Sequence, residues 1–373
     1  MRPFALLLPF LCLLGCCGPD QDPDKAISLH QAMSDGSSGN DDAGFARTLE
    51  PRSFSFPQDH GPHPEFKNEW WYFTGNLADE SGRRFGYQVT FFRIGLAADG
   101  AARTSRWATR RVWMAHVALS DIRAGEHHAR ERLVRGALGL AGATTEPLRA
   151  WVEDWSLSRE ADSEPWRLEI ETDAFSLDLE LNALRPPVLQ GDRGLSRKSA
   201  EPGNASYYYS IPRLETRGEL SVEDRGYRVQ GLSWLDREWS TSALGPEQAG
   251  WDWFSMQLDD GTDIMYYRLR RKDGRPDPHS RGSVQLPDGT RVDLLPEEVE
   301  LRPLKWWENR DGRRYPIVWE FRAMRLRRTI RVQALIPDQQ MDLSVRYWEG
   351  AVELLDARDS GHLGYGYLEM TGY

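Results

Sequence analysis

Apolar and polar residues alternate along many short segments after residue 53, and this pattern predicts β-strands. Between Phe175 and Leu181 every second residue is Phe or Leu, and Ser, Asp and Glu stand between them. A two-residue period of this kind is typical of a strand with one buried face. Other extended runs with apolar or aromatic content are 85–94, 112–119, 227–235, 263–269 and 330–335.

Turn signals separate these runs. Asp-Gly pairs, which favour hairpins and tight turns, occur at 99–100, 260–261, 273–274, 288–289 and 311–312. Only 126–140 has a pattern that also suits a helix, and this segment contains two glycines. Because helices and strands do not alternate, a parallel α/β sheet is disfavoured. We therefore expect an all-β protein built from barrels or sandwiches.

An aromatic sequence occurs twice. Residues 70–79 (WWYFTGNLAD) align with 251–260 (WDWFSMQLDD), and a glycine turn and a second aromatic run follow each copy. A duplicated β-domain explains this spacing, with the joint at the Gly245-Pro246 turn. A chance likeness of two aromatic hairpins is the alternative. We expect an N-terminal domain at 53–241 and a C-terminal domain at 242–373.

The amino-acid composition restricts the classes of function that the protein can have. The chain has 373 residues, 47 basic and 57 acidic, with a net charge of −10 and no basic stripe, which disfavours nucleic-acid binding. Hydrophobic content of 40% and charged content of 28% are ordinary for a folded globular protein. The 15 Trp, 13 Tyr and 13 Phe require a large core or an aromatic-lined cavity.

The first residues predict a lipoprotein signal peptide at 1–15. Arg2 precedes an apolar run that ends in Leu-Leu-Gly-Cys16, a pattern in which the cysteine is acylated and becomes the new N-terminus. A plain secretory signal is the alternative. Residues 16–52 read as a flexible tether. We expect a lipid-anchored protein on the periplasmic face of a bacterial cell envelope, and the absence of Asp after Cys16 favours the outer over the inner membrane.

Ordered motifs along the chain resemble a known family. They are 59–66 (DHGPHPEF), 69–77 (EWWYFTGNL), 88–93 (QVTFFR), 115–121 (AHVALSD), 204–209 (NASYYY), 234–239 (WLDREW) and 366–373 (GYLEMTGY). This series resembles the AttH-like family, which includes the carotenoid 1,2-hydratases. The resemblance implies two tandem lipocalin-like β-barrel domains, the first of them hydratase-like. It also implies an ABC transporter permease as a candidate partner, because some family members look like companions of such systems.

The richest candidate site is 234–239. On a strand, Asp236 and Glu238 share one face and lie about 6.6 Å apart along it, where one carboxyl can act as general acid and the other as base. Tyr266 is a third candidate catalytic residue. Aromatic side chains that can line a ligand site and shield a cation are Trp70, Trp71, Tyr72, Trp234, Trp239, Trp251, Trp253 and Tyr267.

Arg237 argues against catalysis at this site. An acid-Arg-acid sequence is often a structural ion-pair ladder, and the hydratases that this chain resembles carry a functional histidine at the position of Arg237. Arginine does not shuttle protons near neutral pH. A glycosidase pair is a weaker alternative, because neighbouring residues of one strand rarely flank a sugar bond from both sides.

Other motifs add little. His60 and His63 lack a nearby third ligand, so we expect no metal site. His116 in an apolar strand reads as a hydrogen-bonded core histidine. Phosphate loops and nucleophile elbows are absent from the sequence, and no cofactor is expected.

Two functions remain. The first is binding or delivery of a large apolar ligand, such as a lipid, an isoprenoid or an aromatic metabolite, with an accessory role to an ABC export system as one form of it. The alternative is a hydratase that adds water to a C=C bond of an isoprenoid-like substrate. Loss of turnover without loss of stability on replacing Asp236 or Glu238 by its amide separates an enzyme from a binding protein.

Overall fold

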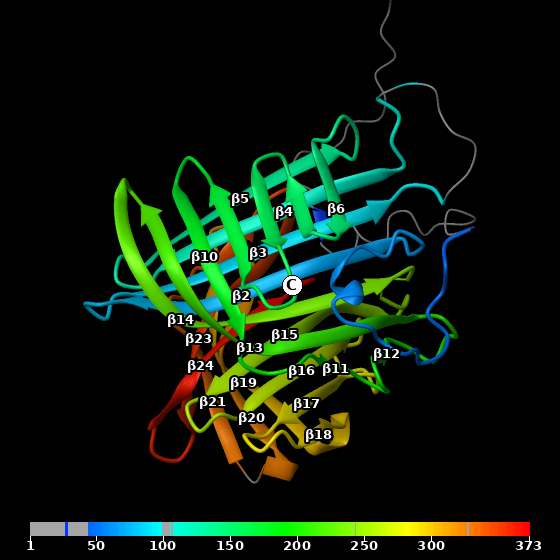
Figure 1. The fold of residues 1–373 in the computed structure, drawn as a ribbon. Helices are drawn as coiled ribbons and strands as arrows, with labels where there is room; N and C mark the ends of the chain where they lie inside the picture. The colour runs from blue at the N-terminus through cyan, green and yellow to red at the C-terminus, as the bar shows by residue number, and fades with distance from the viewer. Residues whose placement is uncertain (1–26, 29–43, 99–104, 106, 243, 327) are drawn as a thin grey trace, which may run out of the picture.

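The computed structural model describes residues 27–28 and 44–373, except 99–104, 106, 243 and 327. Cys16, the signal peptide and most of the predicted tether lie outside these residues. In the described part of the chain, none of the helices has the length and apolar character that crossing a membrane requires. The described chain forms two large, mainly antiparallel sheets (Figure 1).

The first sheet has the strand order β5-β4-β3-β2-β14-β13-β10-β9-β8-β7-β6, and two short strands, β11 and β12, pair with β13. It curls over so that β7 contacts β3, β4 and β5. Its strands are β2 (Asn68–Asp79), β3 (Arg84–Gly95), β4 (Arg111–Asp121), β5 (Glu126–Arg135), β6 (Ala141–Thr145), β7 (Leu148–Val152), β8 (Trp155–Arg159), β9 (Trp166–Glu171), β10 (Phe175–Ala183), β11 (Val188–Leu189), β12 (Leu195–Arg197), β13 (Ala205–Val222) and β14 (Arg225–Ser240).

The second sheet has the order β18-β17-β16-β15-β24-β23-β21-β20-β19, and β1 and β22 pair with β23. Its strands are β1 (Ile27–Ser28), β15 (Gln248–Leu258), β16 (Asp263–Arg271), β17 (Arg281–Gln285), β18 (Arg291–Leu294), β19 (Val299–Glu308), β20 (Arg314–Ala323), β21 (Arg328–Ala334), β22 (Gln340–Asp342), β23 (Val345–Asp356) and β24 (His362–Met370). Three single-turn 3₁₀ helices are η1 (Gln58–His60), η2 (Pro296–Glu298) and η3 (Met324–Leu326).

The all-β prediction is confirmed, and one expectation is corrected. Residues 126–135 form strand β5 rather than a helix, because its Cα partners along β4 run without interruption from Val112 to Asp121. The two glycines at 136 and 139 follow the end of this strand, where the chain turns.

The two copies of the aromatic repeat occupy equivalent places. β2 pairs with the next strand, β3, and with the last strand of its sheet, β14. β15 likewise pairs with the next strand, β16, and with the last strand of its sheet, β24. A duplication of one β-domain predicts this arrangement.

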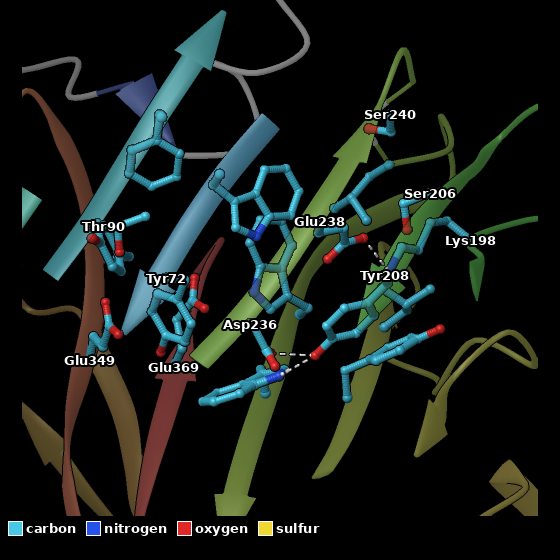
Figure 2. A pocket seen from close by; sticks show the side chains of 18 of the residues that line it. Tyr72, Thr90, Lys198, Ser206, Tyr208, Asp236, Glu238, Ser240, Glu349 and Glu369 are labelled. Atoms are coloured by element: carbon cyan, nitrogen blue, oxygen red, sulfur yellow. Dashed lines mark hydrogen bonds and ion pairs between the residues drawn. The ribbon is translucent and has the colours of Figure 1, made fainter. Parts of the chain in front are cut away.

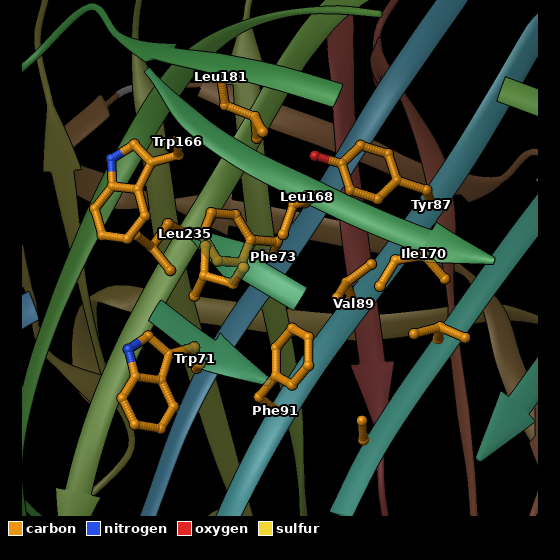
Figure 3. Close-up of a cluster of buried hydrophobic side chains, with 14 of the residues drawn as sticks. Trp71, Phe73, Tyr87, Val89, Phe91, Trp166, Leu168, Ile170, Leu181 and Leu235 are labelled. Atoms are coloured by element: carbon orange, nitrogen blue, oxygen red, sulfur yellow. The ribbon is translucent and has the colours of Figure 1, made fainter. Parts of the chain in front are cut away.

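Each sheet has its own hydrophobic core, and their outer faces meet. Trp71, Phe73, Phe91 and Leu235 point into the core of the first sheet (Figure 3). Their neighbours Tyr72 and Trp234 point the opposite way and pack with Trp253 and Tyr267 of the second sheet. Since successive side chains of a strand alternate between faces, most of β2 and residues 233–240 of β14 are buried on both sides. The outer face supplies the site described next.

Candidate active site

A cavity lies between the two sheets, and both sheets contribute to its lining (Figure 2). The empty space is about 910 Å³ when the adjoining solvent is included, and the centre of a water molecule can move through about 110 Å³ of it. The first sheet and its loops contribute Trp70, Tyr72, Thr90, Phe92, Lys198, Ser206, Tyr208, Asp236, Glu238, Ser240, Ser242 and Leu244. The second sheet contributes Trp251, Trp253, Tyr267, Leu269, Tyr347, Glu349 and Glu369.

Alternation along β14 places the two predicted carboxyls in this cavity. Asp236 and Glu238 both line it, while Leu235 and Trp239, on the other face, belong to the core of the first sheet. The cavity therefore receives two acids from one strand, as the pattern of 234–239 predicts.

Asp236 lies in a cradle of hydrogen-bond donors. The Trp234 indole donates to Oδ1 over 2.7 Å, the Ser210 hydroxyl donates to the same oxygen, and the Tyr208 hydroxyl donates to Oδ2. Burial raises the pKa of Asp236 from 3.8 to about 7, although these three donors oppose the rise. A carboxyl with this pKa can hold and release a proton near neutral pH.

Glu238 has a different environment. Its Oε1 lies 2.9 Å from the Lys198 ammonium, which also sits 4.4 Å from the centre of the Tyr267 ring. Burial opposes the charge of this lysine, but the Glu238 carboxylate and Tyr267 raise its pKa above the ordinary value. The ammonium therefore stays protonated beside the Glu238 carboxyl.

The second sheet brings two further acids, which the sequence analysis did not identify. Glu349 of β23 and Glu369 of β24 are direct cross-strand partners, and both line the cavity. Burial raises the pKa of Glu349 well above its usual range, and the charge of Glu369 adds to this. Burial also raises the pKa of Glu369, and the Trp251 indole opposes that change. Like charges at this spacing disfavour ionisation of both.

The aromatic candidates separate into two groups. Trp70, Tyr72, Trp251, Trp253 and Tyr267 line the cavity, and the Trp253 indole donates to the Tyr208 hydroxyl over 3.1 Å. Trp234 stands behind Asp236 as its hydrogen-bond donor.

Three assignments need correction. Trp71 and Trp239 point into the core of the first sheet, so neither touches the cavity. Tyr266 lies in the core of the second sheet, 5.8 Å between ring centres from Phe321. The neighbouring residue Tyr267 faces the cavity instead, because the strand alternates at this point.

Arg237 also has a role other than the predicted one. It shares no ion pair with Asp236 or Glu238, but lies on the opposite face of β14, 2.8 Å from Glu69. It also donates to the carbonyls of Gly61 and Trp70. Because position 237 points away from the cavity, the arginine there does not bear on proton transfer within it. The predicted ion pairing of Arg237 with Asp236 and Glu238 is therefore wrong.

His63 joins the same buried network rather than a metal site. Its ring nitrogens contact Asp59 and Glu69 at 3.0 and 2.9 Å, and its ring stacks on Trp239 with centres 3.7 Å apart. Within the described ranges, no group of three or more His, Cys, Asp or Glu side chains is arranged to hold a metal ion.

Comparison with known proteins identifies the family. The model of AttH-like proteins matches residues 47–373. The chain belongs to the AttH-like family. A crystal structure of an AttH from Nitrosomonas europaea is 35% identical, covers 88% of this chain and 100% of its own, and superposes with a TM-score of 0.80. The lipocalin-like fold expected from the motifs is thereby shown.

More distant structures share this AttH-like fold. Kievitone hydratase from Nectria haematococca is 14% identical, covers 88% of this chain and 98% of its own, and has a TM-score of 0.67. CghA in complex with Sch210972 is 16% identical, covers 89% of this chain and 97% of its own, and has a TM-score of 0.55. A comparison with curated proteins found no match.

Glu349 and Glu369, which the sequence analysis of this AttH-like chain does not identify, each have one recognisable feature in the sequence. Glu369 lies within the family motif 366–373, and Glu349 is an acid inside an otherwise apolar and aromatic run, 347–352. A charged residue within a buried strand is unusual unless it has a partner or a function. The sequence does not show that β23 and β24 adjoin the cavity.

Proposed function

We propose that this AttH-like protein is a hydratase-type enzyme that adds water to, or removes water from, a carbon–carbon double bond. The observation that carries the proposal is the pair Asp236 and Glu238 in one aromatic cavity. Asp236 has a pKa of about 7, and Glu238 is ion-paired with Lys198. Two carboxyls in contrasting environments are the arrangement that acid–base catalysis requires.

In the hydration direction, Asp236 gives its proton to one carbon of the double bond, and the π electrons form the new C–H bond. The faces of Trp70, Trp251 and Trp253 stabilise the resulting cation. A water molecule attacks the cationic carbon and passes a proton to Glu238. The product has gained one hydrogen and one hydroxyl, and the two carboxyls have exchanged one proton between them.

The lining also defines the substrate class. Eight aromatic residues border the cavity beside four carboxyls and a single lysine that is already paired. Aromatic faces favour an apolar skeleton, and the carboxyls disfavour an anionic group. We infer an uncharged, mainly apolar alkene or tertiary alcohol, such as an isoprenoid chain or a prenylated aromatic compound.

Carriage of an apolar ligand, which the aromatic content first suggests, uses the same surfaces but has no need of the acids. Burying carboxyls without full compensation costs stability, and such groups cluster where chemistry requires them. The likeness to a protein named as a hydratase supports the enzyme reading, although at 14% identity it shows the fold alone.

The location of the reaction is a separate proposal. Acylation of Cys16 anchors the chain to the periplasmic face of the envelope, in the outer rather than the inner membrane, and an ABC transporter permease is a candidate partner. The sequence pattern around Cys16 supports the anchor, and the family resemblance alone supports the permease.

Turnover measurements with amide variants test the proposed activity. Purified protein is incubated with lycopene, neurosporene and kievitone, and products one water heavier are measured by mass spectrometry. We expect turnover of one of these by wild type, with a loss of at least about a hundredfold in Asp236→Asn and Glu238→Gln. Trp71→Phe, in the core, serves as the control. Equal turnover in the amide variants and wild type would reject the assignment.

A further inference from the structure

A buried histidine joins the surface of the first sheet to the cavity. His116 Nε2 lies 2.9 Å from Oε2 of Glu131, and His116 Nδ1 lies 2.8 Å from the Tyr347 hydroxyl. The His116 side chain has no solvent exposure, whereas 17% of the Glu131 side chain is exposed. Tyr347 lines the cavity. These three groups form a hydrogen-bonded chain from solvent to the cavity wall.

The hydrogen-bonded series Glu131, His116 and Tyr347 connects the first sheet with the second. His116 and Glu131 are cross-strand partners on β4 and β5 of the first sheet, whereas Tyr347 belongs to β23 of the second. The hydroxyl of Ser344, also from the second half of the protein, donates to Oε2 of Glu131 over 2.6 Å. The His116 and Tyr347 rings stack with centres 5.7 Å apart. The connection therefore forms only when the two sheets are docked.

The inner end of this hydrogen-bonded chain lies beside Glu349 and Glu369. Tyr347 and Glu349 lie two residues apart on β23, so their side chains share one face of the strand, and both line the cavity together with Tyr72. Neither oxygen of Glu349 has a hydrogen-bond partner of good geometry, and the Tyr72 hydroxyl has none either. Rotation of a hydroxyl, or one water in the cavity, completes the connection from Tyr347 to Glu349.

We propose that Glu131, His116 and Tyr347 form a proton conduit that connects solvent with the Glu349–Glu369 pair and resets the cavity acids after each turnover. This inference rests on the proposed function. After the reaction, Asp236 has lost a proton and Glu238 has gained one. The bound molecule then lies between these two carboxyls and prevents direct exchange of the proton. A route that does not cross the substrate lets the acids regain equilibrium with solvent.

The proton steps balance without any other reactant. Glu131 takes a proton from solvent and passes it to Nε2 of His116, and the ring releases the proton on Nδ1 to the Tyr347 oxygen. Tyr347 passes its own proton to Glu349, which shares it with Glu369. Water in the cavity carries the proton from this pair to Asp236, and the proton of Glu238 leaves by the same steps in reverse. Tautomerisation of the ring restores the starting state. Histidine suits this role because either ring nitrogen can carry the proton.

The groups around the conduit are few. Glu131 and Tyr347 are the titratable partners of His116, and Phe92 covers its ring with centres 5.3 Å apart. Glu369 is the cross-strand partner of Glu349, and Tyr72 and Tyr347 line the same cavity. A purely structural histidine needs partners for its two nitrogens, but it has no need of a partly exposed acid at one end and a cavity at the other.

Buffer dependence of turnover tests the conduit. In His116→Gln and Glu131→Gln, we expect kcat at low buffer concentration to fall about tenfold, with unchanged KM and melting temperature. High concentrations of imidazole buffer restore it, because a small buffer then carries protons to the cavity. His127→Gln is the matched control, since His127 lies on β5, contacts Ser120 at 2.9 Å and has no route to the cavity. Full activity of both conduit variants at low buffer would overturn the proposal.

A second readout needs no substrate and separates this proposal from the hydratase assignment. The measurement starts at an alkaline pH, because the pKa of Glu349 lies well above its usual range. After a rapid drop in pH, time-resolved infrared spectroscopy follows the appearance of the protonated carboxyl band, which Glu349→Gln assigns by its loss. We expect the band to form about tenfold more slowly in His116→Gln than in wild type and His127→Gln. Equal rates in all three proteins would refute the conduit, even if the protein proves to be a hydratase. Slow protonation in a protein without turnover supports the conduit and rejects the hydratase.

Discussion

Replacing Asp236 by asparagine removes a pH-dependent cost from the folded state. Burial raises the pKa of Asp236 from 3.8 to about 7. Because the folded-state pKa lies above the unfolded one, the stability linked to this group is fully present below about pH 4 and is lost as the pH rises through about 7. Asparagine stays neutral at every pH, so the free energy of unfolding of the variant does not fall in this pH range through residue 236.

The size of the effect follows from the displacement of the pKa. A shift from 3.8 to about 7 is roughly 3 units, and each unit corresponds to about 1.4 kcal/mol, so wild type loses about 4 kcal/mol through this group. We expect Asp236→Asn to match wild type within about 1 kcal/mol near pH 4, because a protonated acid and an amide are similar in size and polarity. Near pH 8 the variant is the more stable protein.

Urea denaturation followed by tryptophan fluorescence, at several values between about pH 4 and pH 8, gives the free energies of unfolding. The quantity to compare is the difference between wild type and variant, which removes the contribution of other titrating groups. Asp252→Asn is the control, because Asp252 is a buried acid with partners at Arg268 and Arg270. That variant loses stability instead of gaining it. Parallel stability curves for wild type and Asp236→Asn would refute the raised pKa.

Other predictions concern the rest of the chain. Glu69→Gln leaves two buried arginines without their carboxylate and costs about 3–5 kcal/mol in chemical denaturation; a loss below about 1 kcal/mol contradicts the network. Trp71→Ala costs about 3–5 kcal/mol of stability, whereas Trp253→Ala lowers turnover or ligand affinity per folded molecule; unchanged affinity in the latter argues against its place in the cavity. Cys16→Ala releases the protein from the membrane fraction and abolishes fatty-acid labelling, and retention of this variant in the membrane would reject the anchor.

Much of the fold follows from local patterns in the sequence. The two-residue period predicts strands, and alternation along 234–239 correctly places Asp236 and Glu238 on one face and Arg237 on the other. These results depend on geometry within a single strand, which the spacing of residues determines. The duplicated aromatic run is visible for the same reason, since it requires only comparison of two segments.

The errors arise where strands are buried on both faces. Trp70 and Trp71 are equally apolar, so alternation separates them but does not say which face borders a core and which a cavity. The same ambiguity explains why Tyr266 and Tyr267 are both predicted for the site, although of the two only Tyr267 lines the cavity. Glu349 enters the site through pairing of β23 with β24 and packing of one sheet on the other, and neither long-range contact is visible in a single sequence.

Arg237 shows that the effect of a residue depends on the direction of its side chain. The resemblance to the hydratases implies a histidine at this position, but position 237 faces away from the cavity. Arg237 contacts Glu69 in the network behind β14, whereas His116, read from the sequence as a core histidine, reaches the cavity wall through Tyr347.

Isotope incorporation tests the central claim most directly. Wild type and Asp236→Asn are incubated with each alkene in water enriched in deuterium and ¹⁸O, and the recovered compound is analysed by mass spectrometry. The account predicts one carbon-bound deuterium and one ¹⁸O in the product of wild type, and neither isotope with the variant. Recovery of bound but unlabelled alkene from wild type would contradict the account and favour a ligand carrier.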